Sequence, residues 1–124
     1  MAATLHGETL TIEKNDLLGE WEGEWESPTT NKGGFAKIYI EKPDSAVVVQ
    51  ETSDGRYGDR YDGVLTIKNN KVFIDATSGQ YNQVRYYELI LVKENGNLIL
   101  RGDYTFHGTG RKSGGGTFIV QKKK

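Results

Sequence analysis

The sequence predicts an all-β protein, an eight-stranded antiparallel up-and-down β-barrel that lacks a C-terminal helix. Short runs of alternating apolar and polar residues recur along the 124 residues and are separated by turn residues, as in β-sandwiches and barrels. No longer stretch has a convincing helical period. The links between the runs alternate between tight and long, which is typical of a meander whose successive links lie at opposite ends.

The first expected strand, residues 19–27, begins with GEWEGEWE. Gly and Trp occupy the odd positions of this stretch, and Glu occupies every even one. Because successive side chains of a strand point to opposite faces, we expect Trp21 and Trp25 to point into the barrel and the carboxylates to face water. The sequence therefore places Trp21 near one end of the barrel and Trp25 nearer the other.

The chain before this strand is expected to form an N-terminal arm, residues 1–16, outside a single barrel domain, residues 17–124. A domain of this size can bury one core. Within the arm, ETLTIE at residues 8–13 is expected to form a short strand or an extended segment. The NDLL stretch that follows is expected to make one helical turn, capped by Asn15 or Asp16.

Seven further strands follow from the same alternation, at residues 34–42, 45–53, 61–68, 71–78, 83–94, 97–107 and 116–122. Three of the links are tight, Pro43-Asp44, Asn69-Asn70 and Asn95-Gly96, and such pairs favour hairpin turns. The other four links are longer, so one end of the barrel should be closed and the other ringed by loops. An eight-stranded barrel is either filled by side chains or holds one small ligand, and both outcomes are open here.

The tight turns also predict which side chains share the inner face, because pairing across a hairpin fixes the facing of both strands. The second turn places Tyr61 inside. The first turn pairs Ala36 with Glu51 and so places a carboxylate on the inner face. The third turn places four more side chains inside, Arg85, Tyr87, Tyr104 and Phe106.

Polar and aromatic side chains thus gather toward the looped end of the interior. In one interpretation, Glu51 and Arg85 form a salt bridge that seals the barrel. In the other, they orient a ligand in a pocket with aromatic walls, and Glu51 is then also the candidate catalytic acid–base residue. The expected ligand-binding residues are Trp25, Glu51, Tyr61, Arg85, Tyr87, Tyr104 and Phe106. Loop residues expected at the mouth are Arg56, Tyr57, Asp59, Arg60, Tyr81, Asn82, Arg111 and Lys112.

Composition excludes several classes of function. The net charge of −1 provides no strong field for nucleic acid or anionic lipid. The absence of Cys excludes disulfides, thiolate metal sites and cysteine catalysis. His6 and His107, the latter on an outer face, predict no metal site, and no cofactor is expected. No apolar run approaches the roughly 20 residues of a membrane span. Without a signal-peptide pattern, the chain is expected to be cytoplasmic or a trimmed form of a secreted protein.

The outer face of the fourth to seventh expected strands carries apolar residues that suggest a protein interface. A contiguous apolar patch on a protein surface commonly marks an interaction site. We therefore expect a homodimer or homotetramer packed through this face. The apolar residues expected to project outward are Val64, Phe73, Tyr86, Ile90, Val92 and Ile99.

The stretch Leu18-Gly19-Glu20-Trp21 resembles the Gly-x-Trp motif of the calycin superfamily, which includes lipocalins, fatty-acid-binding proteins and avidins. The resemblance extends over the eight-strand meander, residues 17–122, and over its alternation of link lengths. In lipocalins this Trp lies at the closed end of the barrel and a basic residue packs on it. Lys122 is one candidate for that residue here.

The chain also departs from each of these families. It lacks the terminal helix and disulfide of lipocalins and the ten strands and helical lid of fatty-acid-binding proteins. Avidins use several later tryptophans, and none follows Trp25, which argues against biotin binding. The opening LLGEWEG also looks like that of nitrobindin-type haem barrels, but no His is expected on the inner face.

These patterns predict binding of a small apolar or amphipathic ligand inside a lipocalin-like barrel. Two alternatives stay open. Some lipocalin-like barrels are cyclases or isomerases that hold a substrate in a reactive shape, and the same cavity could serve that purpose. The loop rim, rich in Tyr, Asp and Asn, could instead form a lectin-like or protein-interaction site.

Overall fold

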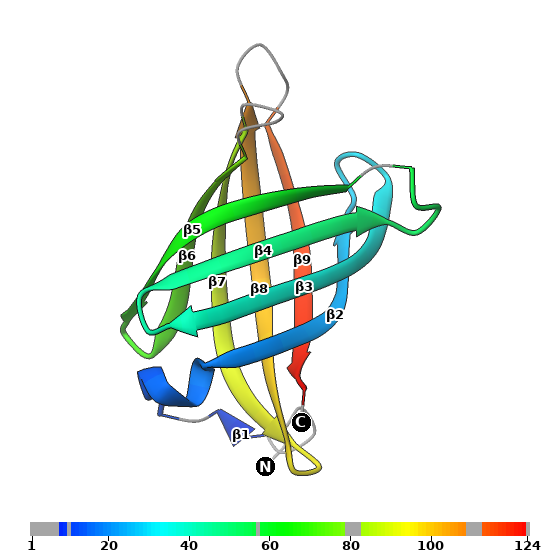
Figure 1. Cartoon of the computed structure of the whole chain (residues 1–124). Helices are drawn as coiled ribbons and strands as arrows, with labels where there is room; N and C mark the ends of the chain where they lie inside the picture. Colours follow the sequence, from blue (N-terminus) through cyan, green and yellow to red (C-terminus); the bar gives the residue numbers. More distant parts are fainter. Residues whose placement is uncertain (1–7, 10, 57, 79–82, 109–112, 124) are drawn as a thin grey trace.

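The structure is a computed structural model that describes residues 8–9, 11–56, 58–78, 83–108 and 113–123. It is a closed, eight-stranded, antiparallel up-and-down barrel, because each of strands β2 to β9 pairs with the next and β9 pairs back with β2 (Figure 1). The barrel strands are β2 (Gly19–Ser27), β3 (Lys32–Lys42), β4 (Ser45–Thr52), β5 (Gly58–Lys68), β6 (Lys71–Ser78), β7 (Gln83–Glu94), β8 (Asn97–Gly108) and β9 (Gly114–Lys122).

The predicted strands are all confirmed, and β2, β6 and β7 have the predicted bounds. Two short elements precede the barrel, β1 (Glu8–Thr9), which pairs with β7, and the 3₁₀ helix η2 (Lys14–Leu17). The single helical turn is therefore confirmed. Its predicted cap is wrong, because Glu13 precedes the turn and no side chain caps it.

Three tight hairpins close one end of the barrel, β3–β4, β5–β6 and β7–β8 (Figure 1). Asn69, Asn70 and Asn95 have φ values of 51°, 57° and 51°, and Gly96 has a φ of 81°. Such left-handed conformations are what two-residue hairpin turns require, and Asn and Gly adopt them most readily. At both turns the strands pair as a two-residue turn requires, and the aromatic side chains predicted to face inward lie in the core or pack against it.

The first hairpin differs from its prediction by one residue. Lys42 pairs with Ser45 as a two-residue turn requires, but a β-bulge lies between Tyr39 and Lys42, and the β3 residues from Gly34 to Tyr39 pair one position away from the prediction. A bulge places two residues opposite one, so it exchanges the two faces of the partner strand. The prediction that Glu51 faces the interior is wrong. Glu51 is exposed on the outer face, and Gln50 is 4 % exposed inside the barrel.

The closed half of the barrel is filled around Trp21. Its ring is fully buried, and its Nε1 donates a hydrogen bond to the carbonyl oxygen of Leu17 in η2 at 2.9 Å. The Lys122 Nζ lies 5.9 Å from the ring centroid and donates to the carbonyl oxygen of Asp16 at 2.7 Å. Lys122 is thus the basic residue that packs on this tryptophan. The segment that precedes β2 and the end of β9 therefore meet at Trp21.

The outer apolar face is smaller than the sequence suggested. Val64 and Tyr86 are exposed, and Phe73 and Ile90 are half-buried. Val92 and Ile99 pair with each other on the outer face, as predicted, but both are buried and add nothing to an exposed patch. The homodimer or homotetramer stays a prediction. In the described part of the chain, no helix is long and apolar enough to cross a membrane.

Because the bulge sets which side chain of β4 is buried, lysine should lower the free energy of unfolding much more at one position than at its neighbour. Gln50→Lys should lower the free energy of unfolding by about 3 kcal/mol or more, because it buries an uncompensated charge. Glu51→Lys should change it by less than about 0.5 kcal/mol, as is usual for exposed positions. Urea unfolding followed by far-ultraviolet circular dichroism measures both. Greater destabilisation by Glu51→Lys would contradict the pairing of β3 with β4.

Candidate ligand-binding cavity

A cavity of about 660 Å³ lies inside the barrel toward the longer links. This end lies opposite the one that the three tight hairpins close (Figure 1). The described side chains and backbone that line it are Trp25, Ser27, Thr30, Lys32, Gln50, Thr52, Gly58, Asp59, Tyr61, Gln83, Arg85, Tyr104 and Phe106.

Aromatic side chains form the walls of the cavity. Trp25 is held in place by a hydrogen bond from its Nε1 to the carbonyl oxygen of Glu51 at 3.0 Å. Its ring meets Tyr104 edge-on at a centroid distance of 6.4 Å, and Tyr104 lies 6.3 Å from Phe106. Edge-on and tilted contacts of this kind are favourable and restrict ring movement. The walls are therefore apolar surfaces of defined shape.

The floor of the cavity is built around Gln50. Its Oε1 accepts a hydrogen bond from Arg85 Nη1 at 2.5 Å and another from the Tyr87 hydroxyl. Its Nε2 is buried and has no hydrogen-bond partner among the described residues. Tyr87 itself lies under the floor rather than in the wall, with its ring stacked on Tyr104 at 5.6 Å. The orientation of the Gln50 amide follows from the two donors, Arg85 and Tyr87, that its oxygen accepts from.

Arg85 contributes the charge of the floor. Its Nε donates to Gln83 Oε1 at 2.9 Å, and the Tyr61 hydroxyl donates to the same oxygen at 2.9 Å. Its guanidinium carbon lies 4.2 Å from the Tyr61 ring centroid, a cation–π contact. Among the described residues no carboxylate lies within ion-pair distance of Arg85. The predicted salt bridge between Glu51 and Arg85 is wrong.

The tyrosine hydroxyls of this site are held in the neutral form. Burial raises the pKa of Tyr61 to about 12, against the opposing charge of Arg85. Burial likewise raises the pKa of Tyr87 and of Tyr104, and Arg85 again opposes the shift. Near neutral pH these hydroxyls can donate and accept hydrogen bonds, but they cannot serve as anionic bases.

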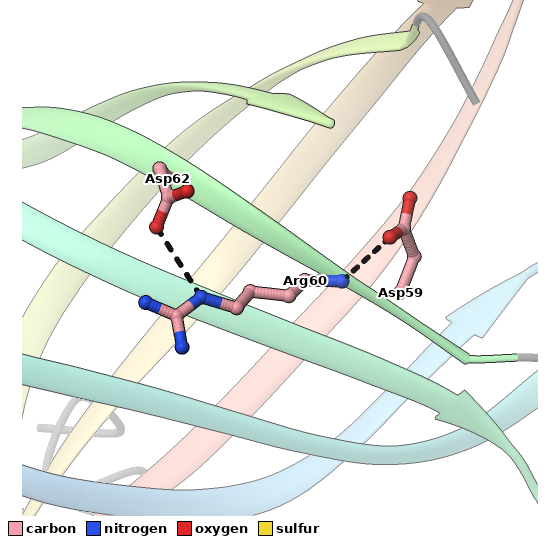
Figure 2. Close-up of polar contacts among 3 residues, drawn as sticks. All are labelled: Asp59, Arg60 and Asp62. Carbon is pink, nitrogen blue, oxygen red and sulfur yellow. Dashed lines mark hydrogen bonds and ion pairs between the residues drawn. The ribbon is translucent and has the colours of Figure 1, made fainter. Parts of the chain in front are cut away.

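At the rim, neighbouring residues of β5 point to opposite sides of the sheet. The Asp59 carboxylate lines the cavity, where it accepts hydrogen bonds from the Ser78 hydroxyl and from the backbone nitrogen of Arg60 at 2.8 Å. The Arg60 side chain instead extends along the strand toward Asp62, and its Nε lies 3.4 Å from an Asp62 carboxylate oxygen (Figure 2). Arg56 is exposed. The other five residues predicted for the rim lie outside the described residues, namely Tyr57, Tyr81, Asn82, Arg111 and Lys112.

The structure brings together most of the predicted site. Trp25, Tyr61, Arg85, Tyr104 and Phe106 line one cavity, and Tyr87 supports its floor. Glu51 contributes only its backbone oxygen, so its carboxylate is not placed to act as an acid or base on a molecule in the cavity.

Sequence reasoning missed Gln50 and Gln83. A signal for Gln50 existed, because an amide costs less to bury than a carboxylate, and this preference favours the facing of β4 that the structure has.

His107 is exposed, as predicted, and its Nδ1 lies 2.9 Å from the Ser113 hydroxyl. Over the described ranges, no cluster of three or more His, Asp or Glu side chains could hold a metal ion.

Comparison of the chain with models of protein families, with curated proteins and with solved structures gives no match. The closed eight-stranded barrel and the contact between Trp21 and Lys122 are consistent with a calycin-like fold. Inferences about function therefore rest on the cavity and its residues.

The raised tyrosine pKa values predict a loss of stability at alkaline pH. A hydroxyl whose pKa is higher in the folded state binds its proton more tightly there, so its contribution is complete below about pH 10. That contribution is lost as the pH rises toward 12, the pKa of Tyr61. Urea unfolding between pH 9 and pH 11 should show a falling free energy of unfolding.

Tyr61→Phe should reduce this fall, because it removes one of the hydroxyls concerned. Tyr86→Phe is the matched control, since Tyr86 is exposed on the outer face of β7, and it should leave the slope as in the wild type. Equal slopes for wild type and Tyr61→Phe would contradict the pKa assigned to Tyr61.

Proposed function

We propose that this protein is a lipocalin-like binding protein that holds a small amphipathic molecule inside the barrel. The observation that carries the proposal is the cavity of about 660 Å³, whose walls are aromatic and whose floor is polar. Small-molecule sites are typically concave and apolar, with a few convergent polar groups that fix orientation. An amphipathic ligand matches this division, with its apolar body between the walls and its polar end on the floor.

The construction of the site also favours binding. The wall residues come from β2, β5 and β8, and their side chains contact one another or hydrogen-bond to β4 and β7. A site on strands of a closed barrel is largely preformed, so little ordering free energy is lost on binding. Catalysis has less support, because the carboxylate proposed as acid–base group, that of Glu51, lies on the outer face.

The proposal predicts that the apolar dye N-phenyl-1-naphthylamine binds in the cavity. Its fluorescence should rise on mixing with the protein, and energy transfer from Trp25 should report its position. Phe106→Ala removes part of the wall and should weaken binding roughly tenfold, because burial of an aromatic side chain contributes about 1.5 kcal/mol or more.

Phe35→Ala is the matched control, since Phe35 is an exposed phenylalanine on the outside of β3. It should leave the affinity for the dye unchanged. Native mass spectrometry of the purified protein offers an independent route to a co-purified ligand. A dye that fails to bind, or that responds equally to both substitutions, would argue against the proposed site.

A further inference from the structure

We propose that the cavity selects ligands that carry one acidic group, a carboxylate or sulfonate, and that Arg85 receives this group at the floor. This inference rests on the proposed function and narrows it to amphipathic monoanions. The observation behind it is a juxtaposition in the described part of the chain, where an Arg85 side chain without a carboxylate partner lies beside a buried Gln50 amide nitrogen without a hydrogen-bond acceptor.

The charge of Arg85 is uncompensated in the described part of the chain. The oxygens that accept hydrogen bonds from its guanidinium belong to the neutral amides of Gln50 and Gln83, and the hydroxyls of Tyr61 and Tyr87 that also interact with it carry no charge. Its aromatic neighbours, Tyr61 at 4.2 Å and Tyr104 and Phe106 at 5.6 Å, stabilise a cation but carry no net charge. A cation that is partly removed from water gains most from an anion placed beside it.

The guanidinium is also pre-oriented for such a partner. Gln83 accepts a hydrogen bond from its Nε and Gln50 accepts one from its Nη1, while the neutral hydroxyls of Tyr61 and Tyr87 also interact with the guanidinium. A planar guanidinium held in this way keeps a rigid donor edge that matches the geometry of a carboxylate. Arg85 lines the cavity, so an acidic group can reach this edge from inside.

Gln50 adds a second donor to the same floor. Its side chain is more than nine-tenths buried, and its Oε1 is occupied by Arg85 and Tyr87, so its Nε2 must be the free end of the amide. A buried donor without an acceptor costs free energy that a ligand oxygen can restore. The floor therefore offers two kinds of donor, one charged and one neutral.

The number of negative charges is limited by Asp59. Its carboxylate lines the cavity with Arg85 and Lys32, the other charged residues among the described lining. A ligand with a second anionic group near the rim would approach Asp59 and be repelled. A single acidic group that reaches Arg85, on an otherwise apolar body, avoids this repulsion and fits the aromatic walls.

Two matched dyes test the inference. The anionic dye 8-anilino-1-naphthalenesulfonate differs from the neutral N-phenyl-1-naphthylamine by its sulfonate. Arg85→Gln should weaken binding of the anionic dye about tenfold or more, because a hydrogen bond to a charged group is lost, and should change neutral-dye binding less than about twofold. Arg85→Lys should retain part of the affinity for the anionic dye. Arg60→Gln, on the outside of the same end, should affect neither dye.

Wild-type protein provides a second test that needs no variant at the site. Octanoate and 1-octanol have the same chain length, and octanoate should displace the neutral dye at the lower concentration. If both dyes bind but Arg85→Gln affects them equally, or if octanol competes better than octanoate, the anion selectivity is overturned while the binding function stands. If neither dye binds to wild-type protein, both proposals are overturned.

Discussion

The site depends on one extra residue in β3. The bulge between Tyr39 and Lys42 exchanges the faces of β4, so that the amide of Gln50 points inward and the carboxylate of Glu51 points into solvent. With the opposite facing, a carboxylate would be placed on the inner face that also carries Arg85, where an ion pair could neutralise the cation. With the facing observed, the cation is oriented by neutral oxygens and keeps its charge.

The barrel divides stability and binding between its two ends. At the closed end, Trp21 is enclosed by η2 and Lys122, and the surrounding apolar side chains fill the interior. At the looped end, Trp25 belongs to the wall of a cavity. A chain of 124 residues can bury only a limited core, so the well-packed half offsets the packing lost to the cavity. The tryptophans of one strand thus have different roles.

Most of the fold could be predicted from the sequence because its signals are local. Alternation marks the strands, and the left-handed Asn and Gly residues fix two hairpin turns and their pairing. The bulge was not predictable in this way. Val47, Val48 and Val49 are apolar on either face, so the alternation of β4 carries little information, and only the burial cost of Glu51 relative to Gln50 favours the facing observed. The contact of Arg85 with Gln50 depends on that facing and was missed with it.

A crystal structure of the protein with 4-iodobenzoate tests the account most directly, because the iodine is located by its anomalous scattering and the acidic group by its density. The account predicts iodine between Trp25 and Phe106, with the carboxylate within hydrogen-bond distance of Arg85. Iodine found only on outer surfaces, or a looped end filled by side chains with no space for the ligand, would contradict it.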